Sequence, residues 1–386
     1  MTRIYLDHVG TTPPAAEVIE AMLPHFGEKF GNPSSPSARG LSALGTLAGA
    51  RAAVASLLSC PEEEILFTGS ATESNNLALK GIAAAAPAGG AHIVAASTEH
   101  LSILHPLRSL QRCGLRVTLL PVDAYGRVDP DDLRRALTTP TALVSVAHAS
   151  AEIGTLQPIM DLCRIAAEHG VPLHCDATVT AGLVPWPREG PRPDLITLTP
   201  HLFYGPQGVA ALRVRSGIRL RPLIEGGAQE GGLRAGTEAV AAIAGFGAAA
   251  ALATRRMHLR AERGREHARR LRRLLEERLQ GLTFTGHPVE RAPGHLSLCV
   301  RGVDAEALLR ALDESGVEAA SGSACTTEAG KPSHVLTALG IDAALARGAL
   351  TLSFGEISRD DDPEQTAELL PPAVRRLRAL SPSGLD

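Results

Sequence analysis

Short apolar runs alternate with longer helical patterns through the first two-thirds of the chain. The apolar runs, bounded by turn residues, predict buried strands, and residues 72–86 and 159–169 are examples of the helical patterns between them. This alternation predicts an α/β fold with a mostly parallel, seven-stranded sheet sandwiched by helices. The predicted strands are residues 65–68, 92–96, 116–120, 142–147, 172–175, 194–198 and 209–214.

The pattern changes near Thr254, where a long and strongly charged helix begins and continues to about Leu279. The strands and helices predicted after it are typical of a small α+β domain. Because 386 residues are too many for one simple core, we expect two domains. These are a large domain over residues 1–253 and a small α+β domain over residues 254–386. The N-terminal segment of the large domain is also able to pack on the small domain.

Composition indicates an ordinary globular protein, with 44% hydrophobic and 20% charged residues. The net charge of −3 gives no overall positive field for nucleic acid or an anionic membrane. Residues 255–278 carry ten arginines and four glutamates, but no aromatic residues interleave for base stacking, so a solvated helix face is favoured. With no secretory signal or bilayer-length apolar run, we expect a cytoplasmic protein without nucleic-acid or membrane partners.

Several polar residues follow predicted strands, at the edge where active sites form in such sheets. Thr72 begins a helix, whose free N–H groups and hydroxyl suit a phosphate but also suit a simple helix cap. Asp176 ends a strand, where a buried carboxylate needs a cationic or N–H partner. His100 follows another strand, and its ring is able to stack on a planar group or to serve packing. Cys325 lies in a loop of small residues that leaves a thiol accessible.

The order and spacing of these segments resemble the cysteine desulfurases of the class V aminotransferase superfamily. The resemblance covers nearly the whole chain and implies a large domain of the fold-type I aminotransferase kind. The loop Ser321-Gly-Ser-Ala-Cys325 is quite specific to desulfurases. The other matching segments are Tyr5-Leu-Asp-His-Val-Gly-Thr-Thr-Pro13, Gly31-Asn-Pro-Ser-Ser35, Ala71-Thr-Glu-Ser74, Thr98-Glu-His100, Glu152-Ile-Gly154, Asp176-Ala-Thr178, Tyr204-Gly-Pro206 and Arg234-Ala-Gly-Thr237.

The resemblance also implies roles for individual residues. In that family a lysine holds pyridoxal phosphate as an aldimine, and a loop cysteine takes the sulfur of free cysteine as a persulfide. The family builds each site from two subunits, which implies a homodimer. The implied contacts are Thr72, Thr199 and His201 for the phosphate, Thr237 for the phosphate of a neighbouring subunit, His100 and Asp176 for the ring, Arg234 for the substrate and Cys325 for the sulfur.

The chain departs from the family pattern at five positions. Leu202 stands where the family has its lysine, and leucine forms no Schiff base. Val179 replaces a glutamine, Ser150 and Ala151 replace paired asparagines, and Thr351 replaces the arginine that binds the substrate carboxylate. We therefore expect pyridoxal phosphate to be absent or only weakly and non-covalently bound, with no metal in its place, since no Cys-x-x-Cys pair signals one.

Three functions remain open from the sequence. The first is a pseudoenzyme that accepts sulfur at Cys325 and has a sulfur acceptor, an iron–sulfur scaffold protein or an active paralogue as its partner. The second is an active pyridoxal-phosphate enzyme that uses another amine, such as Lys331, or a non-covalently held cofactor. The third is a structural or regulatory binding module. We also expect Cys325 to be the most reactive of six thiols, because the other five lie in apolar patterns where thiols are usually buried.

Overall fold

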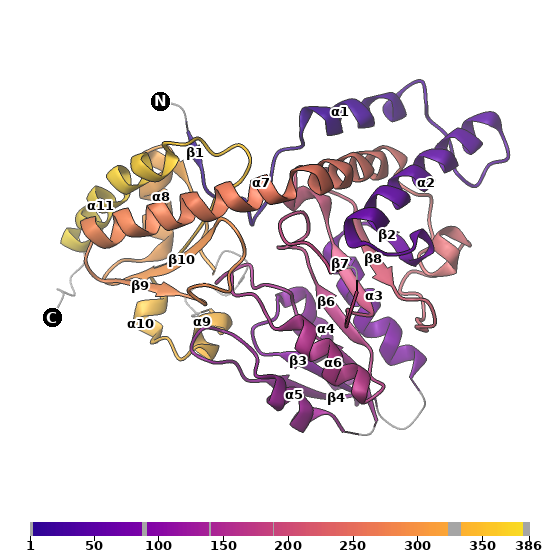
Figure 1. Cartoon of the computed structure of the whole chain (residues 1–386), viewed down its shortest axis with the longest axis horizontal. Helices are drawn as coiled ribbons and strands as arrows, with labels where there is room; N and C mark the ends of the chain where they lie inside the picture. The colour runs from indigo at the N-terminus through magenta and orange to yellow at the C-terminus, as the bar shows by residue number, and fades with distance from the viewer. Residues whose placement is uncertain (1–2, 87–90, 139, 188, 323–332, 381–386) are drawn as a thin grey trace.

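The structure is a computed structural model that describes residues 3–86, 91–138, 140–187, 189–322 and 333–380. Two packed units share one long helix (Figure 1). Cys325 and Lys331 lie outside the described residues.

The larger unit is built on a seven-stranded sheet of order β2-β8-β7-β6-β5-β3-β4. Adjacent strands run parallel except at β8, which is antiparallel to both of its neighbours. This confirms the predicted fold class and every predicted strand to within two residues at each end. The strands are β2 (Ile65–Thr68), β3 (His92–Ala96), β4 (Arg116–Leu120), β5 (Thr141–Ser145), β6 (Leu173–Asp176), β7 (Leu195–Leu198) and β8 (Ala210–Val214).

Helices cover both faces of this sheet. Side chains alternate between the faces along a strand, so Ile93 packs with one helical layer and Val94 with the other. The layer on the Ile93 side is made by α3 (Ala71–Ala85) and α4 (Leu101–Arg112). The opposite layer is made by α2 (Ala38–Leu58), α6 (Ile159–Glu168) and the first half of α7 (Val240–Arg278), with α5 (Pro130–Ala136) alongside.

The smaller unit contains a three-stranded antiparallel sheet of order β12-β10-β9. The chain's first strand, β1 (Ile4–Tyr5), pairs with β11 (Val317–Glu318), and Ile4 belongs to the core of this unit. The N-terminal strand therefore packs in the smaller unit, against residues from the other end of the chain. The remaining elements are β9 (Leu282–Thr285), β10 (His295–Val300), β12 (Ala349–Ser353), α8 (Ala305–Glu314), α9 (His334–Ala338), α10 (Ala343–Ala346) and α11 (Asp362–Leu380).

Helix α7 is continuous from Val240 to Arg278 and crosses the proposed domain boundary at residues 253/254. Its first half packs in the larger core through residues such as Phe246, and its second half packs in the smaller core through Leu271. The change of pattern near Thr254 therefore marks a change in what surrounds the helix rather than a helix end. On its charged face Arg272 pairs with Glu276 at 2.9 Å, in agreement with a solvated helix face.

Helices α1 (Ala16–Met22) and α2 lie together at one end of the larger unit, joined through the short η1 (Leu23–Phe26) (Figure 1). Of the helices in the described part of the chain, α2 is the one that has the length and apolar composition of a membrane span. One of its faces packs inward through Ala43, Leu47 and Val54. A core helix of a globular protein meets the same criterion, so the observation is weak evidence for a membrane.

Candidate functional site

The residues predicted for the site meet at the carboxyl edge of the larger sheet. Asp176 ends β6, His100 follows β3 and caps α4, and Thr199 follows β7. Because parallel strands end at one edge, residues far apart in sequence come together there. A chain of hydrogen bonds joins Asp176 to His100 through side chains of α3 and α4.

Asp176 is buried and already satisfied by neutral donors. Its Oδ2 accepts a hydrogen bond from Nδ2 of Asn75 at 2.7 Å, and its Oδ1 accepts one from the backbone N–H of Thr178 at 3.0 Å. These bonds lower the cost of burying a carboxylate without a cationic partner. The resemblance implies that Asp176 contacts the cofactor ring. It did not indicate that the amide of Asn75 donates a hydrogen bond to this carboxylate.

His100 is held in one tautomer. Its Nδ1 accepts a hydrogen bond from the backbone N–H of Ser102 at 3.1 Å, so the ring proton resides on Nε2 when the ring is neutral. The Ser102 hydroxyl lies 2.8 Å from the same nitrogen and accepts from Asn75 at 2.8 Å. The exposed ring of His100 therefore offers a fixed N–H donor at the edge of the site.

Thr72 and Arg234 meet at the N-terminus of α3. Ser70 and Glu73 form a reciprocal cap there, with Ser70 accepting from the Glu73 N–H at 3.1 Å and Glu73 accepting from the Gly69 N–H at 2.8 Å. Nε of Arg234 donates to the other Glu73 oxygen at 3.0 Å. The predicted substrate arginine is therefore already paired with a carboxylate, while Thr72 is exposed in the first turn.

Thr199 and His201 are positioned by contacts inside the protein. The buried Thr199 hydroxyl donates to the carbonyl of Val209 at 3.1 Å, so its proton is not available to a phosphate oxygen. Nδ1 of His201 lies 3.2 Å from the Thr11 hydroxyl, and burial lowers the pKa of His201. Both features weaken the phosphate contacts that the resemblance implies. Thr237 is exposed on the loop before α7.

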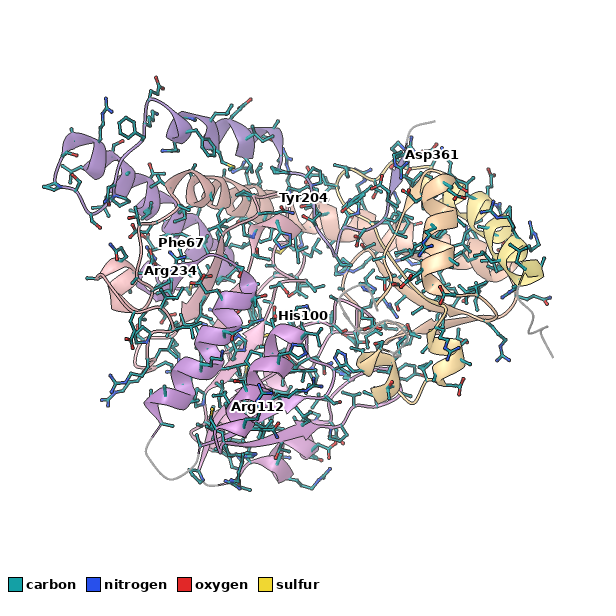
Figure 2. All side chains as sticks on the ribbon, turned by 180° about the vertical axis from the view of Figure 1, so that it is seen from behind. Phe67, His100, Arg112, Tyr204, Arg234 and Asp361 are labelled. Atoms are coloured by element: carbon teal, nitrogen blue, oxygen red, sulfur yellow. The ribbon has the colours of Figure 1, made fainter. Side chains whose placement is uncertain are left out.

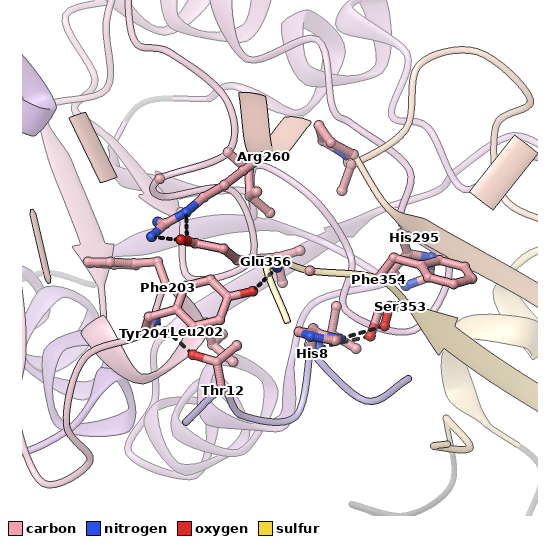
Figure 3. A pocket seen from close by; sticks show the side chains of 17 residues that line it. His8, Thr12, Leu202, Phe203, Tyr204, Arg260, His295, Ser353, Phe354 and Glu356 are labelled. Carbon is pink, nitrogen blue, oxygen red and sulfur yellow. Dashed lines mark hydrogen bonds and ion pairs between the residues drawn. The ribbon is translucent and has the colours of Figure 1, made fainter. Parts of the chain in front are cut away.

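Leu202 ends the short η3 (Pro200–Leu202) and lines a cavity between the two units (Figure 3). Val179 lines the same cavity and packs with Ala149 and Ala292 in a small apolar cluster. The cavity volume is about 30 Å³, which is room for one or two water molecules. Leu202 and Val179 thus place apolar side chains where the resemblance implies the amine of a lysine and the amide of a glutamine.

The same cavity contains polar groups that the sequence did not reveal. Nδ1 of His8 donates to the carbonyl of Ser353 at 2.7 Å, so Nε2 carries a lone pair that has no partner among the described residues. Burial lowers the pKa of His8 to about 4 and keeps its ring neutral at pH 7. Arg260 stacks over the Tyr204 ring at 4.6 Å and donates to Glu356 at 2.6 Å. Arg260 looked like any other arginine of the charged helix, so only the fold could reveal it.

The other departures from the family pattern hold the loop after β5. The Thr351 hydroxyl, on β12, donates to the carbonyl of Glu152 at 3.1 Å. The Ser150 hydroxyl accepts from the Glu152 N–H at 3.3 Å, and the carbonyl of Ala151 accepts from Nε2 of His295 at 2.8 Å. These side chains therefore support backbone geometry and present no charge for a substrate carboxylate.

Both described ends of the segment that carries Cys325 lie at this edge. A Cβ atom on Gly322 would lie 2.1 Å from Oε1 of Glu152, so a larger residue there would require that side chain to move. At the other end, Ser333 caps α9, and Nε2 of His334 donates to the carbonyl of Glu99 at 2.9 Å. The end at Ser333 is thus held next to the residue that precedes His100.

Comparison with known proteins agrees with this architecture. The family model for aminotransferase class V matches residues 4–362. The chain belongs to the aminotransferase class V family. A cysteine desulfurase IscS from Dictyoglomus turgidum is 41% identical over 98% of this chain and 96% of its own length. One from Methanosarcina thermophila is 40% identical, over 98% and 94%.

Solved structures of the family superpose on nearly the whole chain. A NifS-like protein matches with a TM-score of 0.89 at 30% identity, over 98% of this chain and 99% of its own. A NifS-like protein from Rickettsia africae matches with a TM-score of 0.87 at 29% identity, over 97% and 99%. The fold of these relatives is therefore preserved here in both units.

Pyridoxal phosphate is the cofactor expected from this family, but the described residues do not fit it as a covalently held group. Leu202 provides no amine, and neither described lysine, Lys29 or Lys80, lines the cavity beside it. Thr199 and Arg234 have partners within the protein.

The expectation that the other thiols are buried is wrong for one of them. Cys113 is exposed at the end of α4, because the chain turns there and offers it no packing. Cys60 is partly buried, and Cys163, Cys175 and Cys299 are buried. Burial raises the pKa of Cys163 to about 12, which keeps that thiol protonated.

A buried carboxyl beneath the site generates a pH prediction. Glu99 accepts from the Ala147 N–H at 2.8 Å, and burial, with a smaller effect from Asp176, raises its pKa to about 8. The folded protein then holds a proton that the unfolded chain loses above its ordinary pKa of 4.5. The contribution of Glu99 to folded stability should therefore fall as pH rises from about 4.5 to about 8.

We expect Glu99→Gln to remove this contribution, so that the stability of the variant falls less, or rises more, with pH over this range than that of the unaltered chain. Urea unfolding at intervals between pH 5 and pH 8 measures the slope. The control is Glu314→Gln, at an exposed side chain, which should leave the slope as it is. An unchanged slope in Glu99→Gln would show that Glu99 is already ionised in the folded protein.

Proposed function

We propose that this chain is a member of the desulfurase group that has lost Schiff-base chemistry and takes up sulfur as a persulfide on Cys325. The names of its relatives, cysteine desulfurases, support sulfur transfer as the class of activity. The observation that carries the proposal is Leu202, which lines a cavity of about 30 Å³ where the family has its lysine. None of the side chains that line this cavity carries an amine, so a change of their rotamers cannot place one beside Leu202.

The site retains groups that serve a sulfur acceptor. The thiolate of Cys325 attacks the outer sulfur of a donor persulfide, so a new S–S bond forms while the donor S–S bond breaks. The donor leaves as a thiolate and takes up a proton, and no oxidant is needed. His100, with its fixed N–H donor, and the anchored ends of the loop at Gly322 and Ser333 support this role.

A homodimer is part of the proposal. Large apolar side chains are exposed together on α1, η1, the following turn and the start of α2, with Phe26 at 70% and Leu41 at 59% exposure. Such a surface favours burial against a second copy. The loop that carries Thr237 is anchored beside it, because Glu230 in that loop pairs with Arg51 of α2 at 2.8 Å. This arrangement supports a place for Thr237 near the site of the partner.

The first prediction concerns the missing amine. Leu202→Lys should allow borohydride to trap pyridoxal phosphate on residue 202, while the unaltered chain yields no such adduct. Alanine production from cysteine should nevertheless stay about 30-fold or more below that of a variant that also carries Val179→Gln and Thr351→Arg. Loss of a buried charge-assisted pair costs about 2–5 kcal/mol, which corresponds to that factor or more.

Absorbance spectra and an alanine assay measure both effects, and circular dichroism checks that each variant folds. Alanine released by the unaltered chain with added pyridoxal phosphate would sink the proposed loss of Schiff-base chemistry. It would favour an active enzyme that uses another amine, such as Lys331.

The second prediction concerns the acceptor thiol. After incubation with glutathione persulfide, mass spectrometry of the intact folded protein should find the extra sulfur on Cys325. Cys325→Ser should lose this loading. Cys113→Ser is the matched control, because Cys113 is exposed but lies away from the site, and loading of Cys325 should persist. If Cys325 stays unmodified while Cys113 is loaded, a structural or regulatory module becomes the better account.

The third prediction concerns the dimer. Phe26→Asp combined with Leu41→Asp should convert a dimer into a monomer in light scattering, because two buried charges would face the partner. The control is Val289→Asp, which changes a side chain that is 77% exposed on the smaller unit. A monomeric unaltered chain that binds lipid vesicles through α2 would contradict the dimer and identify a membrane as the occupant of this surface.

A further inference from the structure

Helix α4 presents a cationic surface that the proposed chemistry does not use. Its residues Leu101–Arg112 include no aspartate or glutamate, and His105, Arg108 and Arg112 are exposed. Among the residues that the structure describes, none forms an ion pair with either arginine. The adjoining α3 contributes a single carboxylate, Glu73, which is paired with Arg234. Since the whole chain carries a net charge of −3, this positive surface is a local feature.

The cationic surface begins at the candidate site. His100 caps α4, and His334 lies close by through its hydrogen bond to the carbonyl of Glu99. Burial lowers the pKa of His334, and the nearby Arg108, His100 and His105 lower it further. Arg108, His100 and His105 therefore lie near His334, beside one end of the segment that carries Cys325. Figure 2 shows the face on which α4 lies, with His100 near the middle and Arg112 farther from the site.

We propose that Arg108 and Arg112, together with the exposed side chains of His100 and His105, form a docking surface for the acidic face of a sulfur-transfer partner protein. The inference rests on the proposed function, since it assumes that sulfur passes between Cys325 and another protein. Complementary charges increase the rate of encounter and fix the orientation of a partner. A partner held along α4 would face the anchored end of the loop at Ser333.

The spacing of the cations favours a protein over a nucleic acid. His105, Arg108 and Arg112 lie three and four residues apart on one helix face, which spans roughly 10 Å. A helix with carboxylates at the same spacing matches this face. The residues of α3 and α4 include no phenylalanine, tyrosine or tryptophan, so no aromatic platform for base stacking lies on either helix.

The test uses the full-length protein and a fluorescently labelled, thiol-free helical peptide with glutamates at i, i+3 and i+7. Anisotropy should show binding at low salt that weakens as ionic strength rises. The variant Arg108→Glu with Arg112→Glu should weaken binding by about 10-fold or more, because like charges then face the peptide. The matched control is Arg273→Glu with Arg278→Glu, two exposed arginines of α7 with the same change in net charge, and it should weaken binding less than about 2-fold.

Two outcomes would overturn the docking surface. One is an equal loss of peptide binding in both double variants, which would show a general charge effect. The other is tighter binding of a single-stranded oligonucleotide than of the peptide, with the same dependence on Arg108 and Arg112. Loading of Cys325 from glutathione persulfide is measured in parallel and should be unchanged in both double variants. Absence of loading in the unaltered chain would contradict the proposed function. The docking surface is tested separately, by the peptide-binding results above.

Discussion

Polar side chains at the carboxyl edge of the large sheet must find their hydrogen bonds inside the protein, and the structure of the site follows from this constraint. Asp176 is buried, and Asn75 together with a backbone N–H supplies its partners. The same requirement explains the pairing of Arg234 with Glu73 and the bond from Thr351 to the loop after β5. Unpaired buried polar groups cost free energy, which accounts for the internal partners of Asp176, Arg234 and Thr351. The site is stable as a network of neutral and paired groups.

The departures from the family pattern reinforce one another. Leu202 and Val179 bring two apolar side chains to one cavity, where the family pattern has an amine and an amide. The carboxylate of Glu356 also lines this cavity, but it is already paired with Arg260. Family membership is therefore compatible with changed chemistry, because the fold depends on the two cores, whereas the chemistry depends on a few side chains between them.

The sequence predicted the sheet well because its strands are continuous apolar runs that differ clearly from the helices between them. It gave no sign that α7 is one helix. The change in composition near Thr254 resembles an end, although it reflects passage from one core to the next. Asp176 and His100 were identifiable from their motifs and their places after strands. Asn75, His8 and Arg260 were not, because their contacts join residues distant in sequence.

Helix α7 has a mechanical consequence for the two units. A continuous helix of 39 residues is a rod of roughly 58 Å, and each half is embedded in a different core. The two units cannot swing about a flexible linker at residues 253/254, because the backbone hydrogen bonds of the rod pass through that point. Relative motion of the two units must therefore bend or break this helix, which makes α7 a stiff strut between the two cores.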